Sequence, residues 1–269
     1  MTQSLLSLDC VAFGVRFQLN ADSDLLLDKM LQCAPYASQR CDTSSADAQP
    51  YTLLGPGKSA VYRLCVGDRV AFESASQQSA LAELTRELMV HTANYAPDRV
   101  FVHAGVVGWQ GRALVLPGTS FAGKTTLVAE LVRAGAIYYS DEYAVLDERG
   151  QVHPYSRSLQ MRQDGSPDQT SVAIEALNGS AGSAPLPVSH VVFTEYMPLA
   201  QWSPEPISPG MAVLEMLRHA IPIQRTPARV MATLARMMET ATAARSQRGE
   251  ASETARALLQ SMSQDARAL

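Results

Sequence analysis

RALVLPGTSFAGKTTLVAELVRAG, residues 112–135, is the stretch that decides the fold. Its first part contains LVLP, an apolar run that predicts a buried β-strand, and its last part, TTLVAELVRAG, has the apolar spacing of an amphipathic helix ending at Gly135. A glycine-bounded loop joins the two. A phosphate site at a helix N-terminus requires this order of strand, loop and helix, so the sequence predicts an α/β fold built around such a site.

The loop itself fits the phosphate-binding pattern G-x-x-x-x-G-K-[ST] at every defined position. In such a loop the glycines let successive backbone N–H groups approach the phosphates, Lys124 reaches the β and γ phosphates, and Thr125 places its hydroxyl on Mg²⁺. We therefore expect ATP and Mg²⁺ as cofactors. The expected nucleotide-binding residues are Gly118, Thr119, Ser120, Phe121, Ala122, Gly123, Lys124, Thr125 and Thr126.

Two adjacent acids, Asp141 and Glu142, follow the predicted helix at the end of a short apolar run, with Asp141 17 residues after Lys124. We expect that run to be a strand of a parallel sheet whose carboxyl edge lies beside the phosphate loop. There, one acid can accept the proton of an attacking hydroxyl while the other orients Mg²⁺ or its waters. A solvated acidic turn is the alternative interpretation, and the nearby phosphate loop favours the catalytic one.

His103 lies in the strand before the phosphate-loop strand, within the run VFVHAGVV. A single histidine in a buried strand is more often a hydrogen-bonded core residue than a catalytic one. The pattern alone therefore favours a structural role for this side chain.

Two regions of different pattern indicate two domains. Residues 1–97 combine short apolar runs, a hairpin signal at Gly67-Asp68 and an amphipathic helix over 79–94, which predicts a small N-terminal α+β accessory domain. Residues 98–269 hold the phosphate loop and form the expected P-loop kinase-like domain. A short apolar run covers residues 10–19. Further expected elements are a hairpin turning at 148–150, a surface loop over much of 163–187, a strand over 188–196, and helices over 211–220, 228–243 and 252–262.

The composition argues against several classes of partner. Lys and Arg number 22 and Asp and Glu 26, for a formal net charge of −4, and no basic block offers a site for nucleic acid or anionic lipid. The first ten residues lack a secretory signal pattern, and no stretch reaches the roughly 18 apolar residues of a membrane span. The four cysteines have neither C-x-x-C spacing nor clustered histidines, so we expect reduced, structural thiols in a cytoplasmic protein.

His103, the loop from Gly118 to Thr125 and the acidic pair after the helix together resemble the catalytic core of the bacterial HPr kinase/phosphorylases. The separation of 21 residues between His103 and Lys124, and the onward spacing to the acids, match that family without gaps. The resemblance covers about residues 100–148. It implies a fold akin to phosphoenolpyruvate carboxykinase, in which a carboxylate activates a protein serine hydroxyl. It also implies a homo-oligomer, because hexamers are usual in the family.

Carried over by position, the resemblance implies that Lys124 binds phosphates, that Thr125 takes the Mg²⁺ role of the family's serine, and that His103 is an active-site histidine. Asp141 matches the first acid of the family's pair and is expected to orient the metal or act as the base. Glu142 stands where the family usually has a second aspartate. This substitution leaves open which of the two acids is the base.

The resemblance ends after residue 148. The family's downstream glutamate, a second metal ligand in a glycine-rich signature, has no match here, and neither has its C-terminal catalytic arginine. On chemistry alone, Glu195 is the candidate metal ligand, and Arg157 or Arg162 the candidate arginine. Because the missing segments help to hold HPr, we expect a different acceptor. The chain looks more like divergent relatives that accompany peptide-modification or exopolysaccharide systems, some of which phosphorylate a peptide hydroxyl.

These features predict an ATP-dependent kinase that transfers the γ-phosphoryl group to a hydroxyl, on Ser or Thr of a peptide or protein acceptor. Two rivals stay open, a nucleotide-binding regulator without a base, and an ATPase that acts on a partner protein without phosphorylating it. Residues 147–150 also fit the D-x-x-G of GTPases, but no N-K-x-D motif occurs, so we interpret them as a simple turn.

Overall fold

The computed structural model describes residues 5–42, 45–56, 60–118, 123–162 and 169–265. The chain is a mixed α/β protein that divides into two compact units, Met1–Asp98 and Arg99–Leu269. This division falls next to the boundary expected from the sequence between residues 97 and 98. Among the described residues, no helix is both long enough and apolar enough to cross a membrane.

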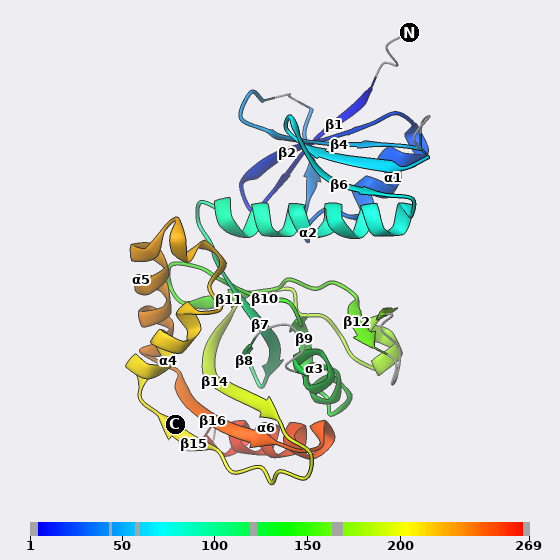
Figure 1. Ribbon diagram of the computed structural model, residues 1–269. Helices are drawn as coiled ribbons and strands as arrows, with labels where there is room; N and C mark the ends of the chain where they lie inside the picture. Colours follow the sequence, from blue (N-terminus) through cyan, green and yellow to red (C-terminus); the bar gives the residue numbers. More distant parts are fainter. Residues whose placement is uncertain (1–4, 43–44, 57–59, 119–122, 163–168, 266–269) are drawn as a thin grey trace. The chain divides into compact units, whose positions relative to one another are not determined.

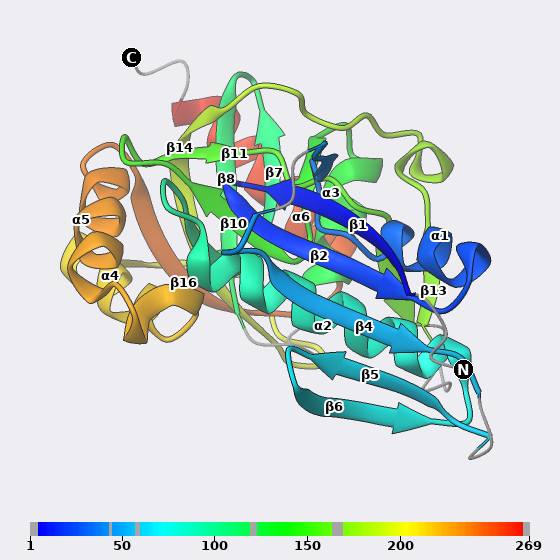
Figure 2. The same cartoon turned by 90° about the horizontal axis from the view of Figure 1, so that it is seen from above.

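The first unit is a six-stranded sheet covered by two helices. Its strands lie in the order β3-β1-β2-β4-β5-β6, and Figure 2 shows how α2 runs across the sheet. Buried leucines of α2, among them Leu84 and Leu88, pack with Phe17 and Leu53 of the sheet, so the apolar stripe of the helix builds this core. The elements are β1 Leu6–Ala12, β2 Val15–Ala21, α1 Asp24–Gln32, β3 Gln39–Arg40, β4 Gln49–Leu54, β5 Tyr62–Val66, β6 Arg69–Ser74 and α2 Gln77–Tyr95.

Turn chemistry explains where the strands of this unit begin and end. The predicted hairpin is confirmed, because Gly67 and Asp68 join β5 to β6 and Gly67 has a φ of +58°. The apolar run over residues 10–19 is divided between two strands. Gly14, with a φ of +77°, turns the chain between β1 and β2, which pair antiparallel. All four cysteines belong to the described part of this unit, and no disulfide joins any two of them.

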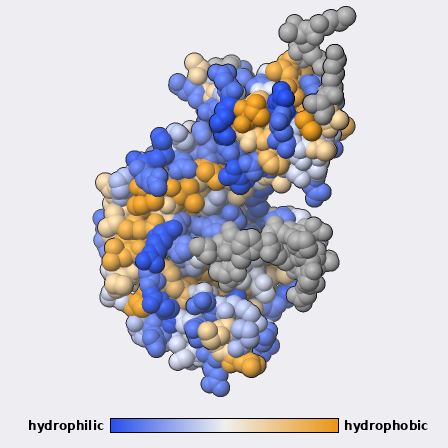
Figure 3. Space-filling model, viewed as in Figure 1, coloured by the Kyte–Doolittle hydropathy of each residue, from blue (hydrophilic) through white to orange (hydrophobic). Residues whose placement is uncertain are grey.

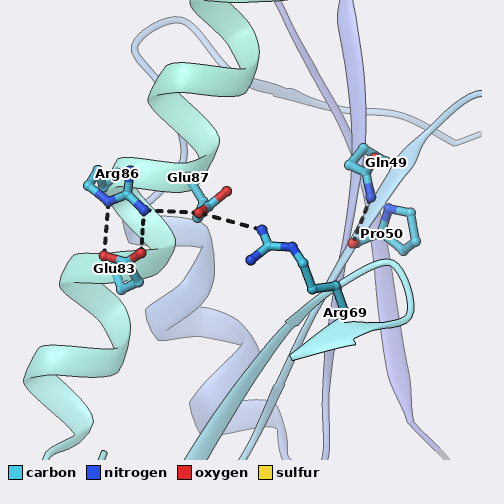
Figure 4. Close-up of polar contacts among 6 residues, drawn as sticks. All are labelled: Gln49, Pro50, Arg69, Glu83, Arg86 and Glu87. Carbon is cyan, nitrogen blue, oxygen red and sulfur yellow. Dashed lines mark hydrogen bonds and ion pairs between the residues drawn. The ribbon is translucent and has the colours of Figure 1, made fainter. Parts of the chain in front are cut away.

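One ion pair connects α2 to the edge strand β6, and two more lie within α2, as Figure 4 shows. Arg86 pairs with Glu83 and, at 3.0 Å, with Glu87, whose carboxylate is 3.8 Å from the guanidinium of Arg69. Pairs of this kind are screened by water and typically contribute under about 1 kcal/mol each. The apolar core, rather than these charges, stabilises the first unit.

The second unit is a sheet with helices on both faces (Figure 1). Its strands follow the order β11-β10-β7-β8-β14-β16-β15, and β9 pairs separately with β7. The elements are β7 Val100–Trp109, β8 Arg112–Pro117, α3 Lys124–Arg133, β9 Ile137–Ser140, β10 Tyr143–Leu146, β11 Gln151–His153, β12 Leu159–Arg162, β13 Gln169–Val172, η1 Ile174–Leu177, β14 Leu186–Tyr196, β15 Glu205–Ile207, α4 Pro209–Leu217, η2 Ile221–Gln224, α5 Pro227–Met238, β16 Thr242–Arg248 and α6 Ala251–Asp265.

Each face of this sheet has its own core. Leu127 of α3 and Leu258 of α6 pack on one face with Leu114, while Met216 of α4 and Leu234 of α5 pack on the other. The apolar strands are therefore buried on both sides, as expected for a sheet between two helical layers. Some apolar side chains stay outside these cores, and Figure 3 shows them gathered over α4 and α5. Exposed side chains there are Met211, Leu214 and Met231.

The strand directions bring several loops to one edge of the sheet. β8, β14 and β16 lie side by side and run parallel, so their carboxyl ends meet at the same edge. β9 also ends there, because β8 and β9 both run antiparallel to β7. The acidic pair therefore lies at the expected edge, although the strand before it pairs antiparallel with its neighbour and not in the parallel arrangement we expected.

Two sequence predictions in this unit are wrong. The helix expected over residues 228–243 ends at Met238, and the chain then forms β16. The surface loop expected over 163–187 contains β13 and η1 in its described part. The turn expected at 148–150 is confirmed, since Gly150 N–H donates to the Asp147 carbonyl at 3.0 Å between β10 and β11.

Candidate active site

The described ends of the phosphate loop sit between β8 and α3. Gly118 follows β8, and Gly123 is the N-cap residue of α3 with a φ of +73°, a left-handed conformation that glycine adopts without strain. Lys124 and Thr125 therefore open the helix, where backbone N–H groups and the helix dipole favour an anion. Thr126 is exposed on the same helix. The expected nucleotide-binding residues Thr119, Ser120, Phe121 and Ala122 lie outside the described residues.

The acidic pair interrupts a strand. β9 and β10 pair with consecutive stretches of β7, and Asp141 and Glu142 are the two residues between them. The buried hydroxyl of Ser140 accepts the backbone N–H of Glu142 at 3.1 Å and that of Tyr143 at 2.9 Å. At the break between β9 and β10 this side chain therefore satisfies two backbone donors that would otherwise need a partner.

Asp141 is held at both carboxylate oxygens. Thr125 Oγ1 donates to Asp141 Oδ2 at 3.1 Å, and Tyr138 Oη donates to Asp141 Oδ1 at 2.8 Å. Burial raises the pKa of Asp141 above its ordinary value, and the two hydroxyl donors act in the opposite direction by favouring the ionised form. Asp141 and Thr125, two of the residues expected from the sequence to bind Mg²⁺, are therefore hydrogen-bonded to each other.

His103 and Glu142 form a second pair at the same edge. Since a carbonyl only accepts, His103 Nδ1 carries the hydrogen in its 2.7 Å contact with the Gly118 carbonyl. This leaves Nε2 facing Glu142 Oε1 at 3.4 Å. The Glu142 side chain is 43% exposed and the His103 side chain 16%, so the glutamate is the member of the pair that an incoming molecule can reach.

Lys124 is buried beside these acids, with 8% of its surface exposed. Burial lowers the pKa of its ammonium from 10.5 to about 8, against the attraction of Glu142 and Asp141. His219 also faces this group, and its backbone carbonyl accepts the N–H of His103 at 2.8 Å. Burial first, and then the charges of His103 and Lys124, lower the pKa of the His219 imidazole.

Arg248, at the carboxyl end of β16, reaches the phosphate loop. Its Nη2 donates to the Gly123 carbonyl at 2.9 Å and its Nη1 to the Gly249 carbonyl at 3.2 Å. The residue is 2% exposed, its Nε has no hydrogen-bond partner, and no ion pair with a carboxylate is found for it in the described part of the chain. Burial lowers the pKa of this guanidinium, and Tyr196 and Glu250 only oppose the shift. A buried cation so poorly compensated is suited to an anionic ligand.

The structure gives fewer contacts for the candidate metal ligand and the candidate arginines that follow the acidic pair. Glu195 lies exposed at the end of β14, on the same sheet edge, but no contact joins it to Thr125 or Asp141 among the described residues. Its metal role therefore stays a prediction. Arg157 lies near the acids through its backbone carbonyl, 2.9 Å from Tyr138 Oη. Arg162 ends β12.

Sequence reasoning missed Tyr138, His219 and Arg248. Tyr138 looked like one more apolar residue of a buried strand, and His219 follows a helix far along the chain. No local signal marks Arg248, because the sequence of its strand, TAARSQR, lacks the β-branched and aromatic residues typical of strands.

The arrangement brings together a helix N-terminus, two cations and two carboxylates, which is a set suited to binding a polyphosphate and moving a proton. Comparison with models of known protein families finds no match for this chain. A search among curated proteins also finds no significant match.

Proposed function

We propose that the second unit is a P-loop kinase domain of the HPr kinase-like type, with the first unit as its accessory domain. It uses ATP to phosphorylate a hydroxyl, on Ser or Thr of a peptide or protein. One observation carries the proposal: Asp141 and Glu142 lie at the helix N-terminus that holds Lys124, with Asp141 bonded to Thr125. The resemblance over about residues 100–148 supports the same reading.

Magnesium fits this site chemically. Thr125 and Asp141 offer a hydroxyl and a carboxylate within 3.1 Å of each other, and both are the hard oxygen donors that Mg²⁺ prefers. Few protein ligands are needed, since substrate phosphates and water complete the coordination of Mg²⁺ in such enzymes. When bound, the ion would neutralise charge on the phosphates.

We assign the two acids different roles on the basis of their contacts. Both oxygens of Asp141 already accept hydroxyl donors beside the phosphate loop, which suits an orienting role at the metal. Glu142 is more exposed and pairs with His103, which suits the base. Lys124 directly follows Gly123 in the chain and Arg248 donates to the Gly123 carbonyl, so both supply positive charge beside the phosphate loop.

The proposed step is a direct displacement. The acceptor hydroxyl oxygen forms a bond to the γ phosphorus while the bond from that phosphorus to the bridging oxygen of ADP breaks, and Glu142 takes the hydroxyl proton. The products are ADP and the phosphorylated acceptor. Glu142 then returns its proton to water, which its exposed side chain permits.

ADP release, measured with and without candidate acceptors, tests the proposal. A kinase accelerates ADP release when a suitable Ser- or Thr-containing peptide is added, and ³²P from the γ position appears on that peptide. An ATPase releases ADP at the same rate without any acceptor. A nucleotide-binding regulator releases almost none, and either of these two results across a peptide library would refute the proposed transfer.

A further inference from the structure

We propose that Tyr138 is a positioning residue for Asp141 and thereby sets the metal affinity of the nucleotide complex. This inference rests on the proposed function, because it concerns the same magnesium site. Tyr138 Oη donates to Asp141 Oδ1 at 2.8 Å, while Thr125 Oγ1 donates to Asp141 Oδ2 at 3.1 Å. The two donors hold opposite oxygens, so together they fix the plane of the carboxylate.

Tyr138 is well built for such a role because it is itself rigid. Its ring is fully buried in the core that contains Leu127 and Ile174. Both of its backbone groups are hydrogen-bonded to one neighbouring segment, since its N–H donates to the Ser180 carbonyl at 2.9 Å and its carbonyl accepts the Gly182 N–H at 2.8 Å. A side chain locked in this way can orient a ligand residue that would otherwise rotate.

The Tyr138 hydroxyl has one hydrogen and two acceptors within reach. The second acceptor is the carbonyl of Arg157, at 2.9 Å. A carboxylate is the stronger acceptor of the two, so the hydrogen points to Asp141 while that group is ionised. The Arg157 carbonyl, in the segment that connects β11 to β12, is then left as the alternative acceptor of this hydrogen.

Tyr138→Phe removes the donor and keeps the ring, and Tyr139→Phe is a matched control. Tyr139 is the next residue of β9 and is also buried, with 3% of its surface exposed. Its hydroxyl donates a 2.7 Å hydrogen bond to the Ala184 carbonyl and not to either acid. Loss of that hydroxyl should leave the metal site intact. The readout is Mn²⁺ affinity in the ADP complex, measured by electron paramagnetic resonance, beside ADP affinity in EDTA.

We expect Tyr138→Phe to weaken Mn²⁺ binding about tenfold or more, the range seen when an outer-shell partner of a metal ligand is lost, with metal-free ADP affinity changed less than about twofold. Tyr139→Phe should change neither. A double-mutant cycle with Asp141→Asn separates orientation from packing. In the Asp141→Asn background, Tyr138→Phe should have no further effect on Mn²⁺ affinity.

Wild-type Mn²⁺ affinity in Tyr138→Phe, equal losses in both tyrosine variants, or an undiminished loss in the Asp141→Asn background would each overturn the inference. These outcomes are independent of phosphoryl transfer. A wild-type protein that binds Mn²⁺ and ADP but phosphorylates no acceptor refutes the kinase while leaving the role of Tyr138 standing.

Discussion

At the scale of single residues, burial of Lys124 changes the pKa of the ammonium group that is expected to bind phosphate. Its pKa of about 8 lies below the ordinary 10.5 because the charged form is desolvated. Bound polyphosphate favours the charged form and raises that pKa again. Between about pH 8 and 10.5 the free lysine is neutral and the bound lysine charged, so binding takes up a proton.

We therefore expect ATP affinity to fall as pH rises from 8 to about 10, approaching tenfold per pH unit. Calorimetric titration in buffers of different ionisation enthalpy should show uptake of up to one proton at pH 9 and little at pH 7. Lys124→Arg is the control, because its guanidinium stays charged throughout. A flat affinity profile for the wild type would contradict the burial of this ammonium.

Arg248 leads to a prediction in which stability and binding change in opposite directions. The residue is buried, with no ion pair to a carboxylate among the described residues. Replacing a buried charge by an apolar side chain of similar volume is often neutral or stabilising. Arg248→Met should therefore unfold at the same or a higher temperature, yet bind Mg-ATP about tenfold more weakly. Paired thermal unfolding and calorimetry would check both signs, and unchanged ATP affinity would remove Arg248 from the site.

Asp141 and Glu142 can be distinguished by charge removal at nearly constant size. Glu142→Gln should bind Mg-ATP normally and lose roughly 10²-fold or more in single-turnover transfer, the loss expected for a general base. Asp141→Asn should instead be partly rescued by raised Mg²⁺ or by Mn²⁺. Metal rescue of Glu142→Gln alone would exchange the two assignments.

At the scale of elements, the interruption between β9 and β10 depends on one hydroxyl. Ser140 is 1% exposed and accepts two backbone N–H groups. Ser140→Ala leaves both donors unsatisfied, and we expect a loss of about 1–3 kcal/mol in the free energy of unfolding, measured in urea. Ser156→Ala, which removes only a 3.4 Å bond to the Tyr139 carbonyl, should cost less. Equal losses would show that the interruption does not rely on Ser140.

The elements also differ in how well they could be predicted from the sequence. The elements around the phosphate loop were predictable because strand, loop and helix there carry strong local signals, and the approach of His103 to Glu142 follows from adjacent strands. β16 was not predictable in the same way. Its sequence TAARSQR lacks the β-branched and aromatic residues typical of strands, and it forms a strand because β14 and β15 pair on either side of it. Because β16 could not be predicted, the position of Arg248 could not be predicted either. Only the pairing of β16 within the sheet brings this residue to Gly123.

At the scale of the whole molecule, the two units have separate interiors. Among the residues that the structure describes, the core of the first unit is formed by residues from Cys10 to Leu88, and both cores of the second unit by residues from Val100 onward. Every candidate residue of the active site, from His103 to Arg248, belongs to the second unit. Folding and nucleotide binding of the second unit should therefore not require the first.

We expect a fragment of residues 99–269 to unfold cooperatively and to show an ATP- and Mg²⁺-dependent thermal shift within a few degrees of that of the full chain, because ligand stabilisation follows the affinity of the folded site. The same fragment carrying Lys124→Ala should lose most of that shift while unfolding at a similar temperature without ligand. This control separates loss of the site from loss of the fold. A fragment that unfolds cooperatively but does not respond to ATP would mean that the first unit completes the nucleotide site, and the accessory role proposed for it would then be wrong.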